Sequence, residues 1–166
     1  MFECTGFSPI LAQHPKVLIL GTMPSVVSLD KAFYYAHPRN AFWPIIESFM
    51  GHALPTIQDK KRACHQLNIS LWDVLQTCQR QGSLDSAIQT PVANNFAALL
   101  EQTPQLKTIA FNGKAAEKLF KKEVLSQQSL PCDLNFISLP STSPAYAAIT
   151  LEEKRLLWQE KLSNVL

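Results

Sequence analysis

The 166-residue sequence has no long apolar run and no cysteine motif. No apolar stretch approaches the roughly 18 residues of a membrane-spanning helix, and the N-terminus lacks the basic start and apolar core of a signal peptide. The four cysteines, Cys4, Cys64, Cys78 and Cys132, lie far apart and form no CxxC pair. Isolated cysteines of this kind are typical of buried thiols in a reducing compartment. We therefore expect a cytoplasmic protein.

The motifs of several enzyme classes are also missing. The sequence contains no P-loop, no GxGxxG and no nucleophile elbow. Its four histidines show no metal-ligand spacing such as HExxH, and no pair of neighbouring carboxylates of the kind that sugar hydrolases use follows an expected strand. We therefore expect no metal and no cofactor. The net charge is only +2, which permits a nucleic acid partner without demanding one.

Short apolar runs alternate with helical patterns along the chain. Strands are predicted at residues 16–21, 68–74, 107–113 and 134–140, and helices at 40–50, 59–67, 93–102, 114–125 and 151–166. Thr150 and Glu153 form a capping box at the last helix. The alternation predicts a single domain over residues 1–166 of class α/β, a three-layer αβα sandwich around a central, mostly parallel four-stranded sheet.

Three of the predicted strand ends carry unusual residues. They are followed by GTMPS and then YYAHPRN, by FNGK, and by LPSTSPAYA. Ligands of parallel sheets bind beyond the carboxyl ends of the strands, so these segments should surround one crevice. Rings, amides and hydroxyls suit a flat, neutral ligand such as a nucleobase.

The aromatic residues of this region leave an alternative open. Phe33, Phe42 and Trp43 are equally consistent with a hydrophobic core. Tyr34 and Tyr35 are adjacent, so one of them should point away from the core if the segment is extended.

Taken together, the segments resemble the uracil-DNA glycosylase superfamily, and most closely its hypoxanthine-DNA glycosylase (DNA-deoxyinosine glycosylase) group, which is related to mismatch-specific uracil-DNA glycosylases. The resemblance covers LILGTMPS, SLDKAFYYAHPRNAFWPII, SLWDVLQTCQRQGSLDSAI, FNGKAA and LPSTSPAYAA. It implies a monofunctional enzyme that flips hypoxanthine out of double-stranded DNA and hydrolyses its N-glycosidic bond in base excision repair.

The resemblance also implies a catalytic residue. In the mismatch-specific relatives the first motif reads Gly-Ile-Asn-Pro, and its Asn orients the attacking water, whereas this chain has Met23 at that position. The hypoxanthine group is similar in this loss and has an essential Asn within HPRN, which is Asn40 here. We expect Asn40 to position the water or to contact the base.

The remaining predicted site residues form two sets. Those expected to bind the base are Thr22 and Met23 through backbone N–H groups, Tyr35 by stacking, and Asn112 at the base edge. Those expected to bind DNA are His37, Arg39, Ser141, Thr142, Ser143 and Tyr146, of which the last four lie where relatives have the loop that enters the duplex.

Other functions remain open from the sequence. The first is a glycosylase of the same fold that prefers uracil or a mismatch. The second is a nucleic-acid-binding module that lost catalysis together with the usual Asn, and the third is an unrelated α/β protein whose aromatic residues are all core. We expect a monomer, because no heptad pattern or long exposed apolar helix is evident.

Overall fold

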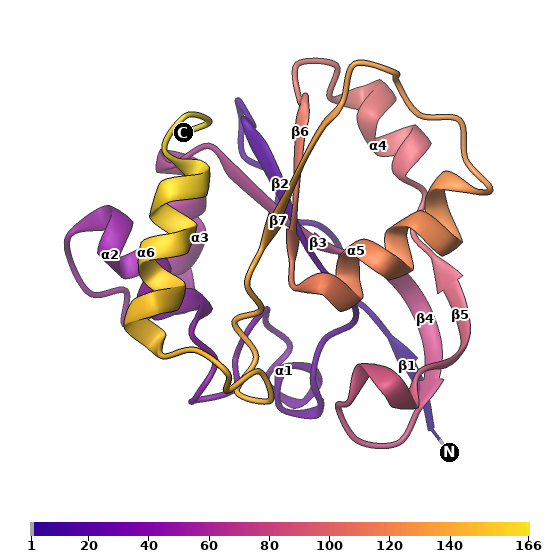
Figure 1. Cartoon of the computed structure of the whole chain (residues 1–166), viewed down its shortest axis with the longest axis horizontal. Helices are drawn as coiled ribbons and strands as arrows, with labels where there is room; N and C mark the ends of the chain where they lie inside the picture. The colour runs from indigo at the N-terminus through magenta and orange to yellow at the C-terminus, as the bar shows by residue number, and fades with distance from the viewer. Residues whose placement is uncertain (1) are drawn as a thin grey trace.

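The computed structural model describes residues 2–166. Figure 1 shows the arrangement of the elements. In chain order they are β1 (Phe2–Thr5), β2 (Val17–Gly21), α1 (Val26–Lys31), α2 (Phe42–Met50), α3 (Ile57–Gln66), β3 (Ile69–Asp73), β4 (Leu75–Arg80), a 3₁₀ turn (Asp85–Ala87), β5 (Gln89–Ala93), α4 (Phe96–Gln102), β6 (Thr108–Asn112), α5 (Lys114–Phe120), a π-helical turn (Lys121–Leu125), β7 (Asn135–Leu139) and α6 (Leu151–Leu162).

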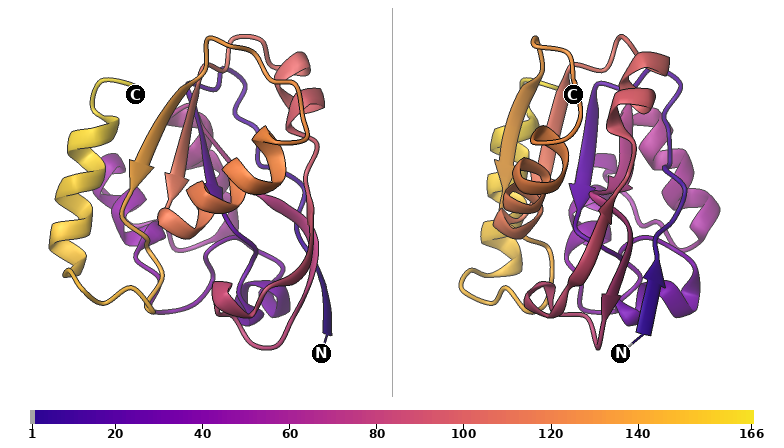
Figure 2. Two further views of the ribbon diagram at one scale, coloured as in Figure 1. Left: turned by 45° about the vertical axis from the view of Figure 1, so that its right-hand side comes forward. Right: turned by 90° about the vertical axis from the view of Figure 1, so that its right-hand side faces the viewer.

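The central sheet has four parallel strands in the order β3-β2-β6-β7. Every residue of β2 and of β6 is buried, as expected for strands that helices cover on both faces. All four strands lie within the ranges predicted from sequence. The predicted parallel sheet is therefore confirmed, and its strands point in one direction toward the loops beside α1 (Figure 2).

Helices cover the sheet on both faces, which gives the predicted three layers (Figure 1). On one face α2, α3 and α6 pack against the side chains of Val17 and Ile19. On the other face α4 and α5 pack against Leu18 and Leu20. Because successive side chains of a strand point to opposite faces, the continuous apolar run of β2 supplies both halves of the core.

A second sheet was not predicted. It is antiparallel, with the order β1-β4-β5, and β4 follows β3 after a single residue. The register between β4 and β5 shifts twice, so the alternation that marks a half-buried strand is broken in the sequence of β4. Arg80, a residue type typical of surfaces, is buried in the same strand.

The helix boundaries differ from the prediction at several ends. The capping box of Thr150 and Glu153 is confirmed. The helix expected to start directly after Asn40 begins at Phe42, and the one expected from Ala93 begins at Phe96, because Ala93 ends β5 and Asn95 caps the helix. No helix within residues 2–166 is long and apolar enough to cross a membrane.

Candidate active site

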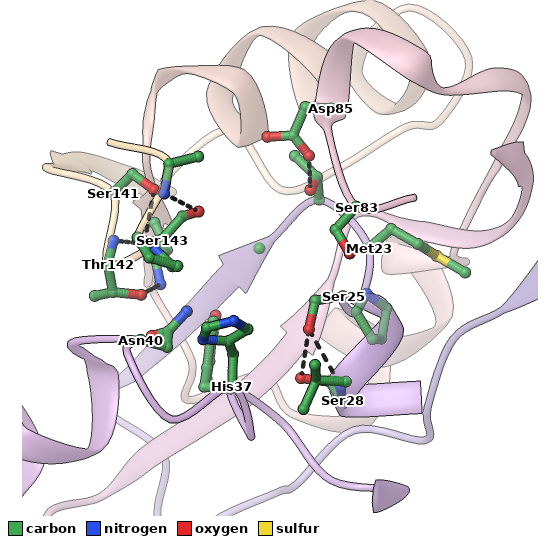
Figure 3. Close-up of a pocket in the computed structure, with 18 of the residues that line it drawn as sticks. Met23, Ser25, Ser28, His37, Asn40, Ser83, Asp85, Ser141, Thr142 and Ser143 are labelled. Atoms are coloured by element: carbon green, nitrogen blue, oxygen red, sulfur yellow. Dashed lines mark hydrogen bonds between the residues drawn. The ribbon is translucent and has the colours of Figure 1, made fainter. Parts of the chain in front are cut away.

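A pocket of about 390 Å³ lies beyond the carboxyl ends of the central strands. This volume falls in the range of roughly 300–1,000 Å³ that is typical of small-molecule sites. The three unusual segments all contribute to its lining, as do residues 83–85. Figure 3 shows Ser141–Ser143 on one side, Met23, Ser25 and Ser28 on the opposite side, and Asn40 beside His37 at a third edge.

The aromatic residues before α2 belong mainly to the core. Phe33 and Trp43 are buried and stacked, with ring centroids 5.6 Å apart, and Phe42 is fully buried. Tyr34 is buried as well, and its hydroxyl donates to the backbone carbonyl of Ser8 at 2.7 Å. The core alternative therefore holds for Phe33, Phe42 and Trp43, whereas Tyr34 is buried but also lines the pocket.

Tyr35 departs from the geometry assumed from the sequence. Its φ of 53° lies in the left-handed region, so the segment is not extended and both adjacent rings pack toward the core. The ring of Tyr35 stacks on Phe42 at 4.1 Å between centroids, and Tyr35 is part of the pocket lining. Burial, and then the nearby carboxyl of Asp73, raise the pKa of Tyr35, so its hydroxyl keeps its proton.

Asn40 lies at the pocket edge with one amide atom engaged and one free. A backbone hydrogen bond from its N–H to the His37 carbonyl closes a turn. Its Oδ1 accepts the backbone N–H of Phe42 at 2.9 Å, which identifies the other amide atom as the nitrogen. Nδ2 makes no hydrogen bond within residues 2–166 and points toward the pocket interior (Figure 3).

His37 and Arg39, in the same turn, are placed differently. His37 lines the pocket, and its Nδ1 accepts the backbone N–H of Arg39 at 3.1 Å. In the neutral ring the proton is therefore on Nε2, which becomes a donor. Arg39 is exposed and lies outside the pocket lining.

Thr22 and Met23 follow the end of β2 and line the pocket. Their backbone N–H groups bind no acceptor in the described part of the chain. The Oγ1 hydroxyl of Thr22 donates to Asp85 Oδ1 at 2.5 Å, which joins the two loops in the pocket wall. The side chain of Met23 is buried and packs in the core beside Leu75.

Asn112 is largely committed to another residue. Its Nδ2 donates to Thr142 Oγ1 and its Oδ1 accepts the Thr142 N–H, both at 2.9 Å. The carbonyl of Thr142 in turn accepts the backbone N–H of Ala41 at 2.9 Å. The buried Thr142 thus connects the end of β6 to the segment before α2.

The loop after β7 is held by side chains that the sequence did not reveal. Lys154, on α6, donates from Nζ to the carbonyls of Ser143 at 3.2 Å and Tyr146 at 2.7 Å, and burial lowers its pKa. Ser141 Oγ accepts the Ser143 N–H. Ser141, Thr142 and Ser143 line the pocket, whereas Tyr146 is exposed outside it with Lys154 beneath its ring.

Several further residues of the lining were not among the predicted site residues. Asp73 ends β3 and is only 4% exposed. Burial raises the pKa of its carboxyl to about 7. The positive charge of Arg80 opposes this rise, and the negative charge of Asp85 adds to it. The others include Ser25, Ser28, Ser83, Leu84 and Asp85. Within residues 2–166 no cluster of His, Cys, Asp and Glu side chains is suited to a metal ion.

Fold and pocket together define an α/β protein with a polar, donor-rich cleft at the strand ends. The chain belongs to the uracil DNA glycosylase superfamily, whose family model matches residues 9–164. The resemblance seen in the sequence is thereby confirmed.

Individual relatives agree with this assignment. The hypoxanthine DNA glycosylase of Methanosarcina barkeri is 39% identical over 111 residues, which are 66% of this chain and 70% of the relative. That of Methanosarcina acetivorans is 37% identical over 113 residues, 67% and 72% of the two chains. A solution structure from Methanosarcina acetivorans, provisionally described as a uracil DNA glycosylase, has a TM-score of 0.77 and 29% identity, and covers 96% of this chain and 98% of its own.

Proposed function

We propose that the protein is a monofunctional DNA glycosylase that flips hypoxanthine out of double-stranded DNA and hydrolyses its N-glycosidic bond, as in base excision repair. The observation that carries this proposal is the unpaired amide nitrogen of Asn40, directed into a pocket large enough for a base. Two relatives named hypoxanthine DNA glycosylase, each similar over about two thirds of the chain, support it.

The donors around the pocket suit the chemistry of glycosidic cleavage. The bond breaks through an oxocarbenium-like sugar, and the departing base carries the negative charge. Preorganised donors that stabilise this charge contribute about 3 kcal/mol each in comparable sites. Asn40 Nδ2 and the free backbone N–H groups of Thr22 and Met23 are three such donors.

The hydrogen bonds of Asn40 favour one of its two expected roles. Its Oδ1 already accepts the Phe42 N–H, so the atom left for the ligand is a donor. A donor binds a carbonyl oxygen or ring nitrogen of the base, whereas activating a water requires an acceptor. We therefore assign Asn40 to the base and to the charge that develops on it.

The other residues provide the walls of the pocket and the contacts to DNA. Tyr35, supported from behind by Phe42, presents a ring to the flipped base, and Asn112 retains one amide N–H for it. The phosphates would be bound by exposed or pocket-lining residues of the two flanking segments, which are His37, Arg39, Ser141, Ser143 and Tyr146. Thr142, also expected to bind DNA, is buried and bound to Asn112, so it holds the loop in place instead. We propose that a monomer binds the duplex, since all of these groups come from one chain.

The test is excision from duplexes that contain a single deoxyinosine, deoxyuridine or deoxyxanthosine, with alkali used to cut the abasic sites. We expect strand breaks at deoxyinosine with the wild type and none with Asn40→Ala. Faster excision of uracil would instead assign the alternative substrate. Tight binding of every lesion without breaks would contradict catalysis and leave a binding module.

A further inference from the structure

Two polar groups at the pocket floor lack a partner in the described part of the chain. Asp73 Oδ2 and the Tyr35 hydroxyl are buried without a well-formed hydrogen bond, although the amide of Asn112 lies near the hydroxyl. An unpaired buried polar group costs about 1–3 kcal/mol. Both residues line the pocket, so these unpaired groups lie in its wall.

Gly21 allows these two groups to approach the end of β2 closely. A Cβ atom on Gly21 would lie 2.7 Å from Asp73 Oδ1 and 3.3 Å from the Tyr35 hydroxyl oxygen. The two groups therefore converge above the bare Cα of Gly21, at the end of β2. Any side chain at this position would displace the carboxyl, whereas glycine lets the carboxyl and the hydroxyl lie together at the end of β2.

The carboxyl of Asp73 carries its proton much more readily than an ordinary aspartic acid. Burial raises its pKa to about 7, so it is mostly neutral at pH 6 and mostly ionised at pH 8. The titratable and charged groups around it come from several elements: Arg80 on β4, Asp85 in the 3₁₀ turn, Tyr34 and Tyr35 before α2, and His37 at the pocket edge.

The protonation state decides which base edge the carboxyl fits. Deamination replaces an amino group, which donates, by a carbonyl, which accepts, and leaves an N–H on the adjacent ring nitrogen. A neutral carboxyl donates to that carbonyl and accepts from that N–H, whereas a carboxylate only accepts. An ionised Asp73 would place an acceptor against the base carbonyl, which is also an acceptor. Its charge would also repel the negative charge on the departing base.

We propose that neutral Asp73 binds the carbonyl and N–H edge of the flipped base and thereby determines that the site accepts deaminated bases. This assignment rests on the proposed function and adds a specificity residue to it. The role is hydrogen bonding: the proton stays on the carboxyl and is not transferred to the leaving base.

The test compares Asp73→Asn with Asp73→Ala. Asparagine is neutral at every pH and keeps one donor and one acceptor at the same place, whereas alanine has neither. Single-turnover excision of hypoxanthine by the wild type should fall about tenfold per pH unit above pH ~7. Asp73→Asn should stay within about tenfold of the wild type at pH 6 and lose this decline, and Asp73→Ala should lose about 100-fold.

Asp85→Asn is the matched control, because it removes the other carboxyl that lines the pocket. The negative charge of Asp85 raises the pKa of Asp73, so this variant should keep the alkaline decline and shift it to lower pH. Melting curves of all variants establish that they are folded.

Two results would overturn the inference. One is a wild-type rate that rises through pH 7, which would make the carboxylate the working form. The other is an Asp73→Asn variant that is as inactive as Asp73→Ala at every pH. This result would mean that the carboxyl has to transfer its proton.

A binding measurement separates this inference from the proposed function. The probes are duplexes with 2′-fluoro-deoxyinosine, whose glycosidic bond resists cleavage, or 2′-fluoro-deoxyadenosine. The wild type should prefer the inosine duplex at pH 6 and lose the preference at pH 8, whereas Asp73→Asn should keep it. If binding follows this pattern but no base is excised from any duplex, the glycosylase activity is refuted and the role of Asp73 is supported. If excision occurs but pH does not change the binding preference, only the role of Asp73 is refuted.

Discussion

The pocket has a carboxamide on two of its sides, Asn40 in the turn before α2 and Asn112 at the end of β6. Both atoms of the Asn112 amide bind Thr142. At Asn40 the oxygen binds the Phe42 N–H and the nitrogen is unpaired. The same type of side chain therefore fixes a loop at Asn112 and presents a free donor at Asn40.

This difference in hydrogen bonding separates a residue that acts on the ligand from one that holds the loop. Both residues lie beside unusual segments, and both were predicted to belong to the site. Only the hydrogen-bond partners distinguish them, because a donor bound to the protein is less available to a ligand. We therefore expect changes at Asn40 to act on catalysis and changes at Asn112 to act on stability and loop position.

Asn40→Asp should have the largest effect on the rate. The aspartate still accepts the Phe42 N–H, but it faces the pocket with a negative acceptor in place of a donor. Loss of one preorganised donor lowers rates by about 10²–10³-fold, so we expect at least this loss in single-turnover excision, with little change in melting temperature. Retained activity would show that Asn40 works as an acceptor for water.

Gly113→Ala should disturb the Asn112 side of the pocket. Gly113 has a φ of +96°, and a Cβ there would lie 2.9 Å from Cβ of Ser141. The loop after β7 must then shift, and a displacement of about 1 Å in a site can lower the rate ~100-fold. The rate and the melting temperature should both fall; an unchanged rate would indicate that the position of this loop is unimportant.

Asn112→Ala should cost more stability than rate. It removes two hydrogen bonds and leaves the Thr142 N–H unpaired, so the free energy of unfolding should fall by about 2–3 kcal/mol in a denaturant titration. Excision should fall about tenfold through the loop. Asn95→Ala, which removes the cap of α4, is the control: it should cost about 1 kcal/mol and leave excision unchanged.

Arg39→Ala should have the smallest effect. Arg39 is exposed beside the turn of Asn40, so its loss should weaken binding of any duplex a few-fold and reduce the salt dependence of the affinity by about one phosphate contact. Arg62→Ala, on α3 beside Asp59, should change neither. Equal effects of the two substitutions would place the DNA elsewhere.

The sequence was sufficient for the central sheet but not for all of the fold. The strands at Val17–Gly21 and Thr108–Asn112 were predictable because both faces are buried and their apolar runs are continuous. The antiparallel sheet was not, because bulges break the alternation of β4 and because Arg80, of a residue type typical of surfaces, is buried in it.

The sequence indicated which segments form the site, but it said less about what each residue does there. Residue types at the strand ends indicated the pocket, and Asn40 lies in it. The hydrogen bonds of Lys154 join α6 to the loop after β7, and local sequence carries no signal for such a tertiary contact. The left-handed conformation of Tyr35 was not indicated by the sequence either. The same is true of the raised pKa of Asp73, which results from its burial in the folded protein.

The most direct test of the account is single-turnover excision from a deoxyinosine duplex by the wild type and by Asn40→Ala, with a melting curve for each. We expect abasic sites with the wild type, a loss of at least about 100-fold with the variant, and similar melting temperatures. Equal rates for the two proteins would show that the free amide nitrogen of Asn40 takes no part in catalysis and would contradict the account.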